Sequence, residues 1–174
     1  RATHHHILSV TSSRADVSIL TPIWRALELR QSVSLSILAT GMHCLDAHKA
    51  EGQLAGFVSN GGRFICAGGD IGGRDEVVAT NGMAKILEAT GRAIKTVRPT
   101  RLLVVGDRLD MMPAVSAGLA SNLPIVHLHG GEITKGAIDD RCRHAITKLA
   151  HIHCVSCSSA KALVSALGEE GWRI

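Results

Sequence analysis

Aromatic side chains are scarce in this sequence. Its 174 residues include no tyrosine, two phenylalanines and two tryptophans, and aromatic residues make up only 2% of the chain. Proteins that bind single-stranded nucleic acid stack bases on aromatic rings along a basic groove. The lysines and arginines here are scattered, so we exclude nucleic acid as a partner despite a net charge of +4. That modest positive charge is better suited to a local site for an anionic or phosphorylated ligand.

Long apolar runs are missing as well. No stretch approaches the roughly 20 apolar residues of a membrane-spanning helix, and no secretory leader can be recognised. Hydrophobic residues make up 45% and charged residues 20% of the chain, proportions that are typical of globular domains. We therefore predict a cytoplasmic protein without a membrane partner. A length of 174 residues suits a single domain with its own core.

The cysteines lack the pattern of a disulfide framework. An odd number, five, occurs in a chain without a recognisable leader, which argues against structural disulfides. Cys154 and Cys157 form a C-x-x-C close to two histidines, a spacing that could indicate redox chemistry or zinc. However, Cys154 falls within an expected strand, and a second ligand pair at the spacing of a zinc knuckle is missing. We therefore predict neither a metal nor a redox cofactor.

Strand and helix patterns alternate along the chain. Apolar runs typical of buried parallel strands occupy residues 5–12, 32–40, 101–107, 123–129 and 152–157. Apolar residues at helical spacing lie between and after them, at 20–27, 83–94, after 107, 142–150 and 160–167. The helix expected after residue 107 is apolar on most sides and should be buried. This alternation predicts an α/β fold, a doubly wound parallel sheet of the Rossmann-like type with helices on both faces.

The segment from residue 45 to residue 76 departs from this alternation. It is rich in glycine and shows little periodicity apart from one short expected strand at 63–67. It is either an exposed flexible loop or a mobile loop that closes over a ligand. Neither G-x-G-x-x-G nor the Walker lysine motif occurs here or elsewhere in the chain, so the fingerprints of dinucleotide and P-loop sites are missing.

Ionisable side chains follow several of the expected strands. Ligands of open α/β sheets bind at the carboxyl ends of the strands, where such side chains meet. They are Arg14 and Asp16 after the first strand, His43 after the second, Asp107 and Arg108 after 101–107, His127, His129 and Glu132 in and after 123–129, and Asp139 and Asp140 at the start of the next helix. Gly130 and Gly131 lie between His129 and Glu132. Taken singly, an aspartate could cap a helix, His127 could be a core histidine, and Asp140 could pair with His144 on a helix surface. Their convergence on one edge favours a site.

The residue types at this edge suit a phosphorylated ligand and proton transfer. Gly130 and Gly131 lack a Cβ and would let backbone N–H groups approach a ligand closely. Arg14 and Arg108 could donate forked hydrogen bonds to a diphosphate. Several carboxylates crowded into one site can have their pKa values pushed apart, which supplies an acid and a base together.

Five motifs, in order along the chain, carry a family resemblance. They are TSSRAD near the start, then ATGMH, VVGDR, HLHGGE and IDDRCRHAITKLAHIH. As a set they resemble the hydrolysing UDP-N-acetylglucosamine 2-epimerases, which make N-acetylmannosamine for sialic acid synthesis and have relatives that act on nucleotide sugars for legionaminic acid. The resemblance covers nearly the whole chain. It departs from the family's pattern at Ser12, at 45–76 and at His129, where some relatives have an acidic residue.

The resemblance implies half of a larger architecture. The family has a GT-B-type fold, in which a nucleotide sugar binds between two Rossmann-like domains. Residues 1–174 resemble the N-terminal domain, and the second domain, which grips much of the UDP, lies outside them. The resemblance further implies a homo-oligomer, either a dimer or a tetramer, with a UDP-sugar as substrate and no cofactor.

The resemblance also implies a reaction and roles for individual residues. UDP leaves as the C2 proton is removed to give a glycal, and water then adds with inversion at C2. Asp107 is the leading candidate for the base, with Glu132 and Asp139 as acid/base partners. The other expected site residues would bind or position the substrate: Arg14, His43, Arg108, His127, His129, Gly130, Gly131, Asp140, Arg143 and His144. Two alternatives stay open, a non-hydrolysing epimerase and a nucleotide-sugar-binding domain without turnover.

Overall fold

The computed structural model describes residues 4–69, 71, 75–134 and 138–174. Six strands form an all-parallel sheet in the order β3-β2-β1-β4-β5-β6. Their bounds are His5–Thr11 (β1), Val33–Ala39 (β2), Phe64–Cys66 (β3), Arg101–Val105 (β4), Ile125–Leu128 (β5) and Ile152–Cys154 (β6). The direction of winding reverses between β1 and β4, as in a doubly wound sheet. The predicted fold class is therefore confirmed, although β6 ends at Cys154 rather than at residue 157.

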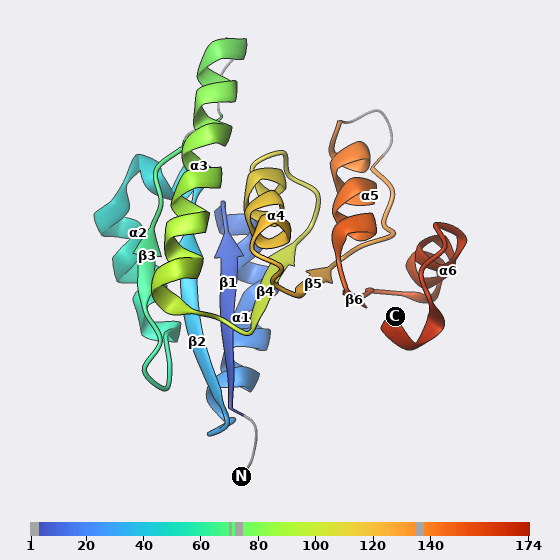
Figure 1. The fold of residues 1–174 in the computed structure, drawn as a ribbon, viewed down its shortest axis with the longest axis horizontal. Coiled ribbons are helices and arrows are strands. Elements are labelled where there is room, and N and C mark those ends of the chain that lie inside the picture. The colour runs from blue at the N-terminus through green and yellow to red at the C-terminus, as the bar shows by residue number, and fades with distance from the viewer. Residues whose placement is uncertain (1–3, 70, 72–74, 135–137) are drawn as a thin grey trace.

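Helices cover both faces of this sheet. They are α1 (Arg14–Glu28), α2 (Ala47–Leu54), α3 (Glu76–Val97), α4 (Met111–Ala120), α5 (Asp139–Leu149) and α6 (Ser158–Ala166), with short 3-10 helices η1 (Gly41–Leu45), η2 (Ala55–Phe57) and η3 (Gly171–Arg173). Figure 1 shows α1 behind the sheet and α3, α4 and α5 in front of it. No helix in the described ranges is both long enough and apolar enough to cross a membrane.

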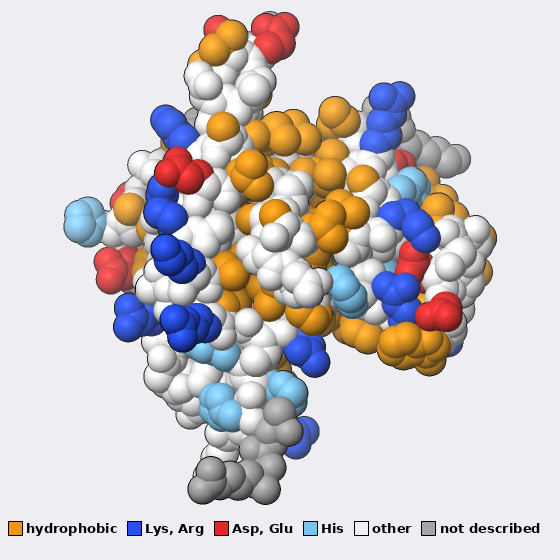
Figure 2. Space-filling model, in the orientation of Figure 1, with side chains coloured by type: hydrophobic (Ala, Val, Ile, Leu, Met, Phe, Trp, Pro, Cys, Tyr) orange, Lys and Arg blue, Asp and Glu red, His pale blue; other side chains and the backbone are white. Residues whose placement is uncertain are grey.

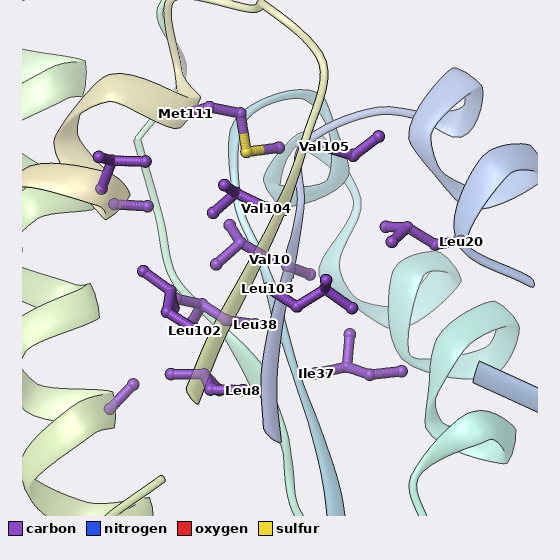
Figure 3. Packing of buried hydrophobic residues seen from close by; sticks show 14 of the residues in the cluster. Leu8, Val10, Leu20, Ile37, Leu38, Leu102, Leu103, Val104, Val105 and Met111 are labelled. Carbon is purple, nitrogen blue, oxygen red and sulfur yellow. The ribbon is translucent and has the colours of Figure 1, made fainter. Parts of the chain in front are cut away.

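The central strands β1, β2, β4 and β5 are largely buried on both sides, which explains their continuous apolar runs. Along β4, Leu102 and Val104 lie on the side of Met111 from α4, whereas Leu103 and Val105 lie on the opposite side, toward α1 (Figure 3). All five side chains are buried. Burying a large aliphatic side chain contributes about 1.5–3 kcal/mol, so this core holds the strand ends, and the loops that leave them, in fixed positions.

The segment from residue 45 to residue 76 is more regular than its sequence predicts. It contains α2, η2 and the expected short strand, which is confirmed as β3. α2 forms because the Asp46 carboxylate accepts a hydrogen bond from the Lys49 N–H (3.0 Å), and because Ala50 and Leu54, one turn apart, are buried. The prediction of irregular structure is wrong here, since two buried residues are too few to reveal a helical period. Outside the described residues lie positions 70 and 72–74.

α4 is buried less completely than its composition predicts. Its sequence, MMPAVSAGLA, contains no charged residue, and most of its side chains pack inward. Leu119 of α4 is nevertheless half exposed, as is Leu87 of the neighbouring α3. Figure 2 shows apolar side chains gathered over α4 and the adjoining part of α3. The helix therefore presents an apolar surface as well as a buried one.

Candidate active site

Two adjoining cavities open at the carboxyl ends of the central strands. The first has a volume of about 610 Å³, and Ser13, Arg14, His43 and Arg108 are among its lining residues. The second has a volume of about 410 Å³ and is lined in part by Arg108 and Asp139. These residues follow β1, β2 and β4, which are neighbours in the sheet, or begin α5. The sheet order thus brings together four of the residues that the sequence analysis assigns to a site.

The turn after β1 is held by a buried carboxylate. Asp16 Oδ2 accepts hydrogen bonds from the backbone N–H groups of Ser12 (2.6 Å) and Ser13 (2.9 Å), and Oδ1 accepts one from the Ser13 hydroxyl (3.2 Å). Asp16 lies in the first turn of α1, where a negative charge also interacts favourably with the helix dipole. Asp16 therefore fixes the start of α1, so that Ser13 and Arg14 face the first cavity.

His43 forms part of the wall of the first cavity. It lies in η1, directly after β2, and is buried. Its Nε2 is 3.1 Å from the hydroxyl of Thr11 at the end of β1. Burial lowers the pKa of His43 below its ordinary value, although the nearby Asp16 carboxylate opposes the change. The ring is therefore uncharged at neutral pH and can position a polar group of a ligand.

The second cavity contains a buried carboxylate, Asp110, that the sequence analysis overlooks. Its side chain is fully buried, and Arg108 donates hydrogen bonds to it from Nη2 (3.2 Å) and Nε (3.3 Å). Burial raises the pKa of Asp110 even though Arg108 favours the charged form. An aspartate before an apolar helix resembles an N-cap, and Asp110 does occupy the N-cap of α4, but its side chain makes no capping hydrogen bond. Asp110 therefore takes up a proton at a higher pH than an ordinary aspartate does.

Gly41 has no side chain and so leaves room for the Asp110 carboxylate. Its φ of +53° lies in the left-handed region, which side chains disfavour. A Cβ at this position would also lie 2.6 Å from Asp110 Oδ2, closer than such atoms approach in proteins. The glycine is thus required both by its backbone conformation and by the packing of η1 against this carboxylate.

Asp107 and Arg143 form an ion pair between the end of β4 and α5. The Arg143 guanidinium donates to Asp107 and, at 3.2 Å, to the Thr134 hydroxyl, and it lies 3.7 Å from Asp140. Only 6% of the Arg143 side chain is exposed, against 20% for Asp107. Burial lowers the pKa of Arg143. The structure therefore joins three predicted site residues in one cluster, in which Arg143 faces protein carboxylates.

Glu132 lies apart from these groups. It accepts a hydrogen bond from the Ser156 hydroxyl (2.6 Å), and its carboxylate is 2.7 Å from His129 Nδ1. With Gly131 it lines a third cavity, of about 420 Å³, against the start of α6. The structure therefore does not place Glu132 in the cavities of Arg14 and Asp139.

His127 is a core residue. It is fully buried, its Nε2 lies 2.8 Å from the Gly106 carbonyl oxygen, and its Nδ1 lies 3.3 Å from the Thr147 hydroxyl. Burial lowers the pKa of His127 to about 4, so the ring is neutral. It is not among the residues that line the three cavities. In this structure His127 supports the end of β5, and its predicted role in binding substrate stays a prediction.

The two glycines after β5 pack closely against their neighbours, and Gly131 is required by this packing and by its backbone conformation. A Cβ on Gly130 would lie 3.0 Å from Thr147 Oγ1, and one on Gly131, whose φ is +80°, would lie 2.3 Å from the Ala160 carbonyl oxygen. They allow this turn to approach α5 and α6. The expected approach of their backbone N–H groups to a ligand stays a prediction. His144, on α5, is half-buried, and within the described residues its Nδ1 has no hydrogen-bond partner.

The described residues contain no group of three or more histidine, cysteine, aspartate or glutamate side chains arranged to hold a metal ion. All five cysteines are free thiols, including the C-x-x-C pair. The ionisable side chains that line the two main cavities are those of arginine, histidine, lysine and aspartate residues.

Comparisons with known proteins identify the family to which this chain is similar. Residues 25–174 match the family model described as UDP-N-acetylglucosamine 2-epimerase. The chain is 32% identical over 166 residues to the UDP-N,N'-diacetylbacillosamine 2-epimerase (hydrolyzing) of Legionella pneumophila, covering 94% of this chain and 43% of that protein. It is 31% identical over 173 residues to the GDP/UDP-N,N'-diacetylbacillosamine 2-epimerase (hydrolyzing) of Campylobacter jejuni, with 97% and 43% covered. The chain thus spans less than half the length of these curated relatives.

Solved structures share the fold at lower sequence identity. The UDP-GlcNAc 2-epimerase of Neisseria meningitidis bound to UDP-GlcNAc matches with a TM-score of 0.77 and 13% identity, over 97% of this chain and 45% of that one. The UDP-GlcNAc 2-epimerase of Methanocaldococcus jannaschii matches with a TM-score of 0.77 and 16% identity, over 97% and 44%. At these identities the likeness establishes the architecture.

Proposed function

Because the chain belongs to the UDP-N-acetylglucosamine 2-epimerase family, we propose that it forms the N-terminal domain of a hydrolysing 2-epimerase. The substrate would be UDP-N-acetylglucosamine or a close analogue, and the products UDP and a free sugar of the N-acetylmannosamine type. One observation carries the proposal: Arg108 is shared by a cavity that contains Arg14 and His43 and a cavity that contains two carboxyl groups. Such an arrangement suits a diphosphate leaving group beside a carbon that exchanges a proton.

Arg14 and Arg108 are the proposed ligands of the diphosphate. Both line the first cavity, and Asp110 orients the Arg108 guanidinium. Burial alone would lower the pKa of Arg108, but its hydrogen bond to Asp110 and the charge of that carboxylate raise it, so the cation persists. Two positioned guanidinium groups stabilise the charge that develops on departing UDP. A second domain would complete the cleft and bind the rest of the nucleotide.

Asp107, the base that the family resemblance implies, remains the proposed base, although among the described residues it lines neither of the two main cavities. Its pairing with Arg143 favours the ionised carboxylate, which can accept the C2 proton as the bond from C1 to the UDP oxygen breaks. The product of this step is a glycal. Glu132 faces the third cavity. Its proposed role is limited to orienting His129.

Asp110 is the proposed proton donor, with Asp139 of the same cavity as the second candidate. Burial raises the pKa of Asp110 and so favours the acid form. The acid protonates C2 of the glycal from the face opposite to the one deprotonated, and water adds at C1. The inverted sugar is thereby released.

The test is a product assay on protein that contains this chain and the residues that follow it. UDP-N-acetylglucosamine and UDP-N,N'-diacetylbacillosamine are supplied separately, with and without EDTA. We expect one of them to yield UDP and free 2-epimerised sugar in equal amounts, and EDTA to leave the rate unchanged.

Other products would support the alternatives. A UDP-linked 2-epimer without free UDP would identify a non-hydrolysing epimerase. Saturable binding of a UDP-sugar without any product would identify a binding domain, and absence of both would refute the proposal. Activity abolished by EDTA and restored by zinc would refute its metal-free chemistry.

A homo-oligomer remains part of the proposal. The support is the apolar surface over α4 and α3, which includes Leu87 and Leu119 (Figure 2), because exposed apolar patches often mark protein interfaces. Light scattering of the wild type and of Leu119→Glu tests it: the wild type should be a dimer or tetramer, and the variant should dissociate.

A further inference from the structure

Two thiols from separate elements lie in contact beside the first cavity. Cys44 belongs to η1 and Cys66 is the last residue of β3, and their Sγ atoms are 3.4 Å apart. Cys44 is flanked in sequence by His43 and Leu45, which both line the first cavity. A chemical change at Cys44 would therefore act directly on the wall of that cavity.

The two thiols differ in their surroundings. Cys66 is exposed and ends the edge strand of the sheet, where a small molecule can reach it. Cys44 is half-buried, and its thiol donates a hydrogen bond to the Ala67 carbonyl oxygen (2.6 Å). Burial, together with the hydrogen bond and charge of Cys66, raises the pKa of Cys44 to about 12. Of these two thiols, Cys66 is therefore the one that reacts first with a reagent from solution.

We propose that Cys44 and Cys66 form a redox-sensitive dithiol that small-molecule disulfides convert into an intrachain disulfide. The Cys66 thiolate attacks one sulfur of the oxidant and releases one equivalent of small thiol. Cys44 then gives up its proton, attacks the Cys66 sulfur of the mixed disulfide and releases the second equivalent. Two protein thiols are oxidised and the two sulfurs of the oxidant are reduced, so electrons and protons balance.

Closure of this bond requires a small movement. A disulfide is about 2.05 Å long, so the two sulfurs must approach by roughly 1.4 Å from their present separation of 3.4 Å. Cys44 lies on a short 3-10 helix, and its displacement would be transmitted to His43 and Leu45 on either side. The bond would also close a loop that contains α2 and η2 and so restrict their opening.

The C-x-x-C at Cys154 and Cys157 provides an internal comparison. The structure brings the Cys157 thiol to the Ser159 hydroxyl (3.1 Å). Hydrogen bonds from Ser159 and from the backbone of Ala160 lower the pKa of Cys157, whereas burial raises the pKa of Cys154. These two cysteines are three positions apart in the sequence, but their thiols are held in different environments. It supplies the matched control for the spatial pair.

Peptide mapping after incubation with oxidised glutathione tests the proposal. Trypsin places Cys44 in peptide 31–49 and Cys66 in peptide 64–74. We expect these two peptides to become linked, with the loss of two hydrogens, before any other cysteine pair. Cys44→Ser should stop at a glutathione adduct on Cys66, and Cys154→Ser should behave as the wild type. Predominant linkage through Cys154, or a stable adduct on Cys66 in the wild type, would overturn the proposal.

Hydrogen exchange tests the structural consequence, and neither readout requires turnover. Oxidised protein should exchange the amide hydrogens of α2 about tenfold more slowly than reduced protein, while α5 serves as the reference. Reduction should restore the original rates, and Cys66→Ser should show no change on oxidation. Equal exchange in the oxidised and reduced states would refute the restriction of this segment.

Discussion

Two buried carboxyl groups, Asp110 and Glu169, show how differently the same functional group behaves in two regions of this molecule. The Glu169 side chain is 2% exposed and has three cationic or imidazole partners: Lys148 Nζ at 2.6 Å, Arg173 Nη1 at 3.0 Å and His153 Nε2 at 3.1 Å. Asp110 is fully buried and has one cationic partner among the described residues, Arg108. Burial alone would raise both pKa values, but the partners of Glu169 lower its pKa, whereas the pKa of Asp110 is raised.

The difference teaches that partners decide what a buried acid does. Glu169 ties α5, β6 and η3 together through Lys148, His153 and Arg173, so it stays ionised and serves stability. Asp110 lies beside a cavity, and the neighbouring Asp16 carboxylate adds to the effect of burial on its pKa. It is thus placed to exchange a proton. Glu169 holds the fold together as a carboxylate. In contrast, the fold makes the ionised form of Asp110 less stable.

The largest expected effect separates the two groups by activity. Asp110→Asn preserves shape but removes the exchangeable proton, so turnover in the complete enzyme should fall about 10²- to 10⁴-fold. Thermal stability should change little, because the cost of burying the Asp110 carboxylate outweighs its favourable pairing with Arg108, as its raised pKa indicates. Glu169→Gln is the control and should retain turnover at a temperature where it is folded. If Asp110→Asn keeps more than about a tenth of wild-type turnover, the proton donor is Asp139 instead.

The second-largest expected effect distinguishes Glu169 from Asp110 by its contribution to the free energy of unfolding. Glu169→Gln leaves Lys148 and Arg173 facing a neutral amide, and breaking a buried ion pair typically costs about 3–5 kcal/mol. Since the Lys148 side chain is 52% exposed, we expect the lower end, about 3 kcal/mol, in urea unfolding. Lys148→Met removes the exposed partner and should cost less than about 1 kcal/mol. Equal losses in the two variants would contradict the central role of the carboxylate.

A third buried group, His127, extends the comparison to pH. Its pKa is lowered by burial from 6.5 to about 4, so the unfolded chain binds a proton at a higher pH than the folded chain. Its contribution to stability is full above pH 6.5 and is lost as the pH falls toward 4, by about 3 kcal/mol in total. His127→Gln should flatten this part of the stability profile, measured by urea unfolding at several pH values. An unchanged slope would mean that other groups cause the acid sensitivity.

The smallest expected effect on stability is that of Asp46, an exposed carboxylate. It lines the first cavity, and its carboxylate accepts a hydrogen bond from the Lys49 N–H at the start of α2. Asp46→Ala should lower the free energy of unfolding by about 1 kcal/mol, whereas Asp46→Asn, which also caps helices, should be nearly neutral. A larger loss, or equal losses in both variants, would show that the charge rather than the cap matters.

Much of the fold could be predicted because parallel strands buried on both faces produce continuous apolar runs. RLLVVGD is such a run, and the structure places β4 within it. The edge to which Arg14, His43 and Arg108 project followed from the parallel sheet alone. α2 escaped prediction because Ala50 and Leu54 are its only buried residues.

The sequence by itself determined the order of the strands and of the helices other than α2, the family, and several of the polar residues at one edge, since these depend on local periodicity and motif. The tertiary structure decided which of those residues meet. It placed Glu132 and Asp139 at separate cavities, set the buried Asp110 beside Arg108, and brought Cys44 to Cys66 while the C-x-x-C thiols stayed in different surroundings. The physical reason is that charge interactions, burial and thiol exchange act through space, over distances that spacing along the chain does not record.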